Sequence, residues 1–175
     1  YTYTNSKSEN WKIDLVDTGL ETMTGGRISR VKELINNEPF FLTYGDGVAN
    51  IDLNALLSQH KVSKKSVTMT AVMPEGRFGA LNIASDNTIT NFTEKPKGDG
   101  SWINGGFFVC ENDVFNYLSN EDDEIFERSP LEKLANDKKL GAYKHNGFWK
   151  CMDTLRDKNL LNELWDNDDA DWKIW

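Results

Sequence analysis

The stretch Phe40-Phe41-Leu42-Thr43-Tyr44-Gly45-Asp46-Gly47 is an apolar run that leads directly into one carboxylate between two glycines. A short, continuous, β-prone run bounded by Pro39 and by glycine predicts a covered inner strand over residues 40–44. In open α/β sheets, ligands bind at the carboxyl ends of the strands, so we expect Asp46 where a metal ion or a phosphate is bound. An ordinary Gly-Asp-Gly turn is the alternative, and the rest of the sequence decides between the two.

The composition is typical of one globular domain over residues 1–175, with 38% hydrophobic and 27% charged residues. A net charge of -8 and a pI near 4.8 argue against a nucleic-acid partner, because a polyanion requires a basic surface. The sequence has no apolar run long enough to span a bilayer, so no membrane partner is expected. Cys110 and Cys151 lack metal-ligand spacing and are interpreted as reduced core residues, which favours a cytoplasmic location.

Strands and helices are expected to alternate along the chain, which predicts a layered α/β fold. The expected strands are residues 12–16, 40–44, 66–73 and 102–110, with a further apolar run at 148–152. Residues 80–83 and 88–93 form a predicted hairpin, which makes the sheet mixed. Helices are expected after Thr24, which is a candidate N-cap, after Asp52, around residues 114–118 and 130–134, and near 157–165.

Several loops combine glycine with polar groups and are candidates for ligand binding. Thr24-Gly25-Gly26, at a predicted helix start, would offer free N–H groups to a base or an anion, with a plain helix cap as the alternative. Glu94 can accept hydrogen bonds from sugar hydroxyls and Lys95 can hold a phosphate, although both could simply be surface charges at a strand end. Asn104 precedes two glycines and can bond a hydroxyl-rich ligand.

A second carboxylate, Asp153, follows the apolar run at residues 148–152. As an isolated feature it could be a helix N-cap. Asp46 and Asp153 could instead converge on one divalent ion, and oxygen ligands without paired His or Cys favour Mg²⁺ over zinc.

The sequence resembles the sugar-phosphate nucleotidyltransferases from about Trp11 to Trp175. The resemblance rests on segments that occur in the family's order. These segments are Leu15-Val16-Asp17-Thr18-Gly19, Met23-Thr24-Gly25-Gly26-Arg27, Thr43-Tyr44-Gly45-Asp46-Gly47, Gly76-Arg77-Phe78-Gly79-Ala80-Leu81, Glu94-Lys95-Pro96-Lys97-Gly98-Asp99-Gly100, Ile103-Asn104-Gly105-Gly106-Phe107-Phe108 and Met152-Asp153-Thr154-Leu155-Arg156-Asp157.

The chain departs from the family pattern at its beginning. Enzymes of this family start with a strand and a Gly-Gly-x-Gly-Thr-Arg-Leu loop, followed by a Lys-Pro segment, and these hold the nucleotide phosphates. Neither segment is found in this sequence. We therefore expect the C-terminal two-thirds of a Rossmann-like nucleotidyltransferase fold with a mixed central sheet, truncated at its N-terminus.

The resemblance also implies roles for particular residues. Asp46 and Asp153 match the aspartates that bind Mg²⁺, and with Lys95 they are the implied catalytic residues. The implied ligands of the sugar phosphate are Gly79, Glu94, Lys95, Asn104 and Gly105. The implied contacts of the nucleotide base are Thr24, Gly25, Gly26 and Arg27.

The implied reaction converts CTP and α-D-glucose 1-phosphate into CDP-glucose and pyrophosphate, by in-line attack of a sugar-phosphate oxygen on the α-phosphorus. The family also implies a homo-oligomer, with hexamers known, and a product used for bacterial surface polysaccharides such as the lipopolysaccharide O-antigen. Two alternatives stay open. The chain could use another nucleoside triphosphate or sugar 1-phosphate, or it could be an inactive fragment or a sugar-phosphate-binding module.

Overall fold

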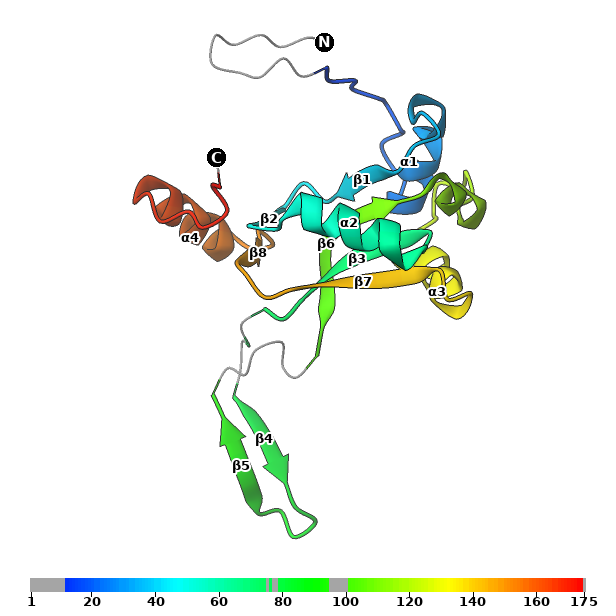
Figure 1. Cartoon of the computed structure of the whole chain (residues 1–175). Helices are drawn as coiled ribbons and strands as arrows, with labels where there is room; N and C mark the ends of the chain where they lie inside the picture. Colours follow the sequence, from blue (N-terminus) through cyan, green and yellow to red (C-terminus); the bar gives the residue numbers. More distant parts are fainter. Residues whose placement is uncertain (1–11, 75, 77–78, 95–100, 175) are drawn as a thin grey trace.

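The computed structural model describes residues 12–74, 76, 79–94 and 101–174. Its centre is a four-stranded sheet in the order β1-β6-β3-β7 (Figure 1). Strand β6 is antiparallel to both β1 and β3, whereas β3 and β7 are parallel, so the predicted mixed sheet is confirmed. The strands are β1 (Phe40–Thr43), β3 (Val67–Val72), β6 (Ile103–Cys110) and β7 (Leu140–His145).

Strand β1 lies at an edge of this sheet, so the prediction of a covered inner strand is wrong for the described part of the chain. Its side chains alternate between half-buried and exposed. Phe40 stacks on Phe115 with the ring centroids 5.8 Å apart, whereas Phe41, on the other face, is 48% exposed. A continuous apolar run therefore did not distinguish a strand covered on both faces from one covered on a single face.

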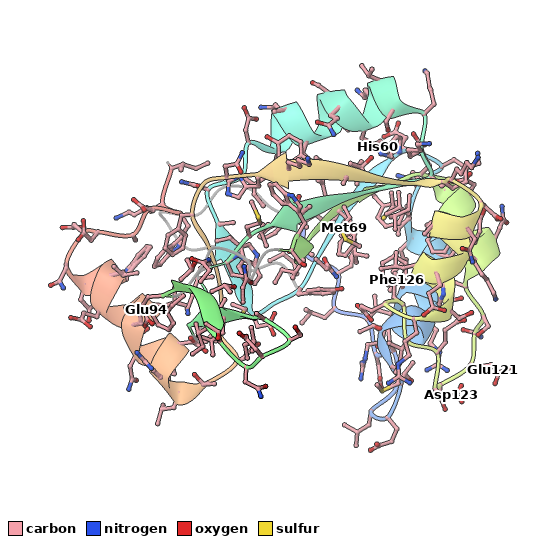
Figure 2. The ribbon with its side chains drawn as sticks, turned by 90° about the horizontal axis from the view of Figure 1, so that it is seen from below. His60, Met69, Glu94, Glu121, Asp123 and Phe126 are labelled. Atoms are coloured by element: carbon pink, nitrogen blue, oxygen red, sulfur yellow. The ribbon has the colours of Figure 1, made fainter. Side chains whose placement is uncertain are left out.

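Helices cover the two faces of the sheet. Phe108 and Cys110 of β6 pack against α1 (Thr24–Arg30), η3 (Asn112–Tyr117) and α3 (Ser129–Asn136). Val109, which points to the opposite face, packs against α2 (Leu53–Ser63). Figure 2 shows His60 of α2 and Phe126 on opposite sides of the sheet.

The smaller elements lie outside this layered core. Strands β4 (Ala80–Ile83) and β5 (Ile89–Thr93) form the predicted hairpin, which extends away from the sheet (Figure 1). Strands β2 (Gly47–Ala49) and β8 (Trp149–Cys151) pair with each other, and α4 (Leu155–Asp166) follows β8. Among the described residues, no helix is long and apolar enough to cross a membrane.

Two predictions of local structure are wrong, and two strands, β2 and β7, were missed. Residues 12–16 are irregular and exposed rather than a strand, because the described chain gives them no strand to pair with. The N-cap of α1 is Met23, not Thr24, and the helix gives way to a 3₁₀ turn, η1 (Lys32–Leu34). Strand β7 was missed because its sequence lacks an apolar alternation, and its parallel pairing with β3 decides its structure.

Phe126 tests the packing on the α1 side of the sheet. Its side chain is fully buried and packs edge-on against Phe108, with the ring centroids 5.7 Å apart. We expect Phe126→Ala to lower the free energy of unfolding by about 3–5 kcal/mol in urea titrations, because the lost ring leaves a cavity. Phe92→Ala on β5 is the control, since Phe92 is 59% exposed. Equal losses in the two variants would contradict this description of the core.

Candidate active site

A pocket of about 180 Å³ lies where the carboxyl end of β1, the start of β6 and the β2–β8 pair meet. Four residues predicted from the sequence line it, namely Asp46, Asn104, Gly105 and Asp153. The structure therefore brings the two predicted metal ligands and part of the predicted sugar-phosphate site to one place. The complete lining is Thr43, Tyr44, Asp46, Gly47, Asn104, Gly105, Gly106, Phe107, Trp149, Cys151 and Asp153.

The β2–β8 pairing brings the two carboxylates together. Gly47, directly after Asp46, is paired with Cys151, two residues before Asp153. The Met152 N–H also donates to the Asp46 carbonyl at 2.8 Å, which extends the pairing toward both acids. Segments far apart in the sequence are thus held side by side by main-chain hydrogen bonds.

The two carboxylates have the chemistry that a hard cation requires. Both side chains are exposed, and within the described residues neither forms an ion pair with Lys, Arg or His. Two adjacent unpaired carboxylates repel each other, and a divalent cation relieves that repulsion. The described part of the chain contains no group of three or more His, Cys, Asp or Glu side chains that could hold a metal ion, so the candidate site has two carboxylates only.

Cys151 is part of this pocket rather than of the core, which corrects its interpretation from the sequence. Its thiol donates to Asp153 Oδ2 at 3.2 Å. Burial, followed by that hydrogen bond and the charge of Asp153, raises the pKa of the Cys151 thiol, so the group remains protonated near neutral pH. Cys110, in contrast, is completely buried in β6, as expected.

The segment that carries Asp153 is fixed on its other side by the start of α4. Thr154 is the N-cap, and its backbone N–H donates to Asp157 Oδ2 at 3.1 Å in a capping box. Asp157 also pairs with Lys150 of β8, with Nζ and Oδ1 2.9 Å apart. These bonds, with Lys150 first, lower the pKa of Asp157 to about 2. Asp157 therefore connects β8 to α4 across the Asp153 loop.

Asp157 predicts a specific dependence of stability on pH. Its folded pKa of about 2 lies below the ordinary value of 3.8. Its contribution is therefore present in full above about pH 4 and is lost as the pH falls toward about 2. We expect the midpoint of thermal unfolding of Asp157→Asn to lie below that of the wild type at pH 6, with the difference shrinking between pH 4 and pH 2. A difference that stays constant over that range would contradict the assignment.

Asn104 is held in one orientation by its neighbours. Its Oδ1 accepts from the Gly106 N–H at 2.8 Å, and its Nδ2 donates to the Tyr44 hydroxyl at 3.0 Å. Gly106 has a φ of +77°, and a Cβ there would lie 2.6 Å from the Tyr44 ring. Glycine at this position therefore permits the close approach of Tyr44, a pocket residue that sequence reasoning missed because a strand-end tyrosine carries no distinctive pattern.

Gly105 has a packing role in the structure. A Cβ on Gly105 would lie 2.9 Å from Val72 Cγ1 and 3.0 Å from the Thr70 carbonyl oxygen, both on the neighbouring strand β3. Its own carbonyl accepts from Trp149 Nε1 at 2.7 Å, which joins β6 to β8 within the pocket lining. Its role toward a sugar phosphate stays a prediction.

Two further predicted ligands lie together at the base of the β4–β5 hairpin, outside the pocket lining. A Cβ on Gly79 would lie 3.2 Å from Glu94 Oε2, so the two residues are neighbours. Their role toward a sugar phosphate is a prediction that the structure leaves open. Lys95, the other charged residue of the predicted sugar-phosphate site, lies outside the described residues.

The start of α1 differs from its predicted form. The N–H groups of Gly25 and Gly26 are not free, because both donate to the Glu124 carbonyl, at 2.8 and 3.4 Å. A Cβ at either glycine would lie within 3.0 Å of the loop that contains Glu121 and Glu124. Arg27 donates to the hydroxyl of Thr18 and the carbonyl of Leu20. The base-contacting role of this segment stays a prediction, and its geometry shows a helix packed against a loop.

Comparison with known sequences identifies the class of protein. The sequence model of the nucleotidyl transferase family matches residues 14–159. The chain therefore belongs to the nucleotidyl transferase family, and the resemblance seen in its sequence is confirmed.

Two bacterial relatives have the same named activity. The glucose-1-phosphate cytidylyltransferase of Salmonella typhimurium (strain LT2) is 48% identical over 172 residues, which cover 98% of this chain and 66% of that protein. A Bacillus subtilis (strain 168) protein, named probable glucose-1-phosphate cytidylyltransferase, is 42% identical over 167 residues, covering 95% of this chain and 65% of the relative. This chain thus spans slightly less than two thirds of the length of either relative.

A solved structure supports the fold. HddC from Yersinia pseudotuberculosis, in complex with GMP-PN, superposes with a TM-score of 0.65 over 90% of this chain and 68% of the other, at 19% identity. The predicted nucleotidyltransferase fold is therefore confirmed.

Proposed function

We propose that the protein containing this chain transfers a cytidylyl group from CTP to α-D-glucose 1-phosphate, giving CDP-glucose and pyrophosphate. The observation that carries the proposal is the convergence of Asp46, Asp153 and Asn104 on one pocket. The choice of CTP and glucose 1-phosphate as substrates rests on the 48% identity to a relative named glucose-1-phosphate cytidylyltransferase.

This reaction requires mainly that the two substrates are positioned and that the charge of their phosphates is neutralised. Asp46 and Asp153 are the residues that would hold Mg²⁺, which supplies charge stabilisation to the phosphates when bound. Asn104, fixed by Tyr44 and Gly106, presents a polar group to the sugar phosphate. Lys95 is proposed to orient the attacking phosphate as a point charge. No general base is required, because the attacking sugar-phosphate oxygen is already anionic near neutral pH.

Specificity for cytosine is proposed from the resemblance to cytidylyltransferases. The segment from Thr24 to Arg27 is its proposed location. The N–H groups of Gly25 and Gly26 and the side chains of Thr24 and Arg27 have partners within the chain, so a base would replace some of these bonds. A relative that uses a different nucleotide illustrates the alternative: mannose-1-phosphate guanyltransferase of Saccharomyces cerevisiae is 27% identical over 146 residues. A comparison of nucleoside triphosphates in the assay below decides between the alternatives.

A homo-oligomer, a hexamer by resemblance, and a cytoplasmic location are part of the same proposal, as is use of the product for surface polysaccharides. Support for self-association comes from apolar side chains of the hairpin that are about half-exposed or more, including Ile83 at 60% and Phe92 at 59%. Trp165 on α4 is also 47% exposed. Exposed apolar groups of this kind are common at subunit interfaces.

Pyrophosphate release tests the proposed reaction. The assay compares CTP, UTP, dTTP and GTP with glucose 1-phosphate and Mg²⁺, using the longest natural chain that contains this sequence. We expect turnover to be fastest with CTP and to stop when EDTA removes the metal. We expect Asp46→Asn to lower kcat by roughly 100-fold or more, because an amide holds a divalent ion poorly, while the circular dichroism spectrum is unchanged.

A matched control is Asp86→Asn, in the turn of the β4–β5 hairpin, where an exposed aspartate only supports local backbone structure. Wild-type turnover in Asp46→Asn would refute its role as a metal ligand. An inactive wild-type enzyme with every nucleotide would favour a binding module instead.

A further inference from the structure

A continuous chain of hydrogen bonds runs from the pocket to the start of α1. Asn104 Nδ2 donates to the Tyr44 hydroxyl at 3.0 Å, and that hydroxyl donates to Glu127 Oε1 at 2.5 Å. From the other side, Thr24 Oγ1 donates to Glu127 Oε2 at 2.7 Å and accepts from the Phe126 N–H at 2.9 Å. Glu127 therefore links Tyr44, which follows β1, to Thr24 at the start of α1.

The directions of these hydrogen bonds require Glu127 to accept from both hydroxyl groups, those of Tyr44 and Thr24. The Tyr44 hydroxyl oxygen already accepts from Asn104, and the Thr24 hydroxyl oxygen already accepts from Phe126, so each hydroxyl directs its hydrogen toward Glu127. An ionised carboxylate accepts at both oxygens, whereas a glutamine amide can accept at only one. Burial and the bond to Glu127 raise the pKa of Tyr44, so its hydroxyl keeps the proton that it donates.

Glu127 does not line the pocket itself. It lies half-buried just before α3, and within the described residues it forms no ion pair. A partly desolvated carboxylate disfavours folding unless hydrogen bonds compensate, so its two hydroxyl donors account for its presence there. Glu127 reaches the pocket through Tyr44, which lines the pocket and accepts a hydrogen bond from the Asn104 amide.

We propose that Glu127 is a positioning residue for the sugar-phosphate site, which it orders by anchoring Tyr44, and through it Asn104, to the start of α1. The assignment rests on the proposed function of the pocket. It extends that function to a residue outside the pocket lining, and it gives Thr24 a role as an anchor of Glu127.

The test is steady-state kinetics of the natural enzyme with Glu127→Gln, Tyr44→Phe and the double variant. We expect Glu127→Gln to raise the KM for glucose 1-phosphate about tenfold, the size of one hydrogen bond to a charged group, with a smaller change in the KM for CTP. Tyr44→Phe should act in the same direction. The double variant should be no worse than the more impaired single variant, because both substitutions break the same chain of bonds.

Glu132→Gln on α3 is the matched control, because Glu132 is exposed and should leave both KM values unchanged. Thr24→Val keeps Glu127 and removes one of its donors, so a smaller increase in the KM for glucose 1-phosphate is expected even if Glu127→Gln folds poorly. Unchanged KM values in Glu127→Gln and Thr24→Val, or effects of Glu127→Gln and Tyr44→Phe that multiply in the double variant, would overturn the assignment while leaving the proposed function intact. A wild-type enzyme without activity would refute the proposed function itself, and this assignment with it.

Discussion

The short pairing between β2 and β8 is the constraint on which the candidate site depends. It aligns Gly47 with Cys151, and the bond from the Met152 N–H to the Asp46 carbonyl extends it toward both acids. Without this pairing, Asp46 and Asp153 would lie on separate loops with no reason to approach each other. Their mutual repulsion would even favour separation. The backbone therefore holds two like charges in place before any cation arrives.

The sheet and its helices supply the rest of the geometry. Strand β6 contributes Asn104 at the pocket and Phe108 in the core, so the packing of α1 and α3 fixes the strand that carries the polar group. The path through Tyr44 and Glu127 adds a polar link between the same two layers. Residues of the helical layer can therefore affect the pocket without lining it. Close packing and hydrogen bonds between the helices and the sheet leave the pocket residues little freedom to move.

Much of the fold could be predicted from the sequence, because strands such as 66–73 and 102–110 are compact apolar runs and the hairpin has a clear turn. Strand β7 could not be predicted, because its parallel pairing with β3, rather than its own residues, decides its conformation. At the site, Asp46 and Asp153 were predicted from their positions after apolar runs. Tyr44 and Glu127 were missed, because a bond between residues so far apart in the chain leaves no periodic signal.

The most direct test of the shared metal site is the stoichiometry of Mn²⁺ binding, measured by electron paramagnetic resonance with Mg²⁺ as a competitor. We expect one ion shared by Asp46 and Asp153, so either Asp→Asn substitution alone should remove the Mg²⁺-competed signal of bound Mn²⁺. An ion that still binds with wild-type affinity in one of the two single variants would show that the carboxylates do not share a cation. That result would show that the β2–β8 pairing does not build one metal site.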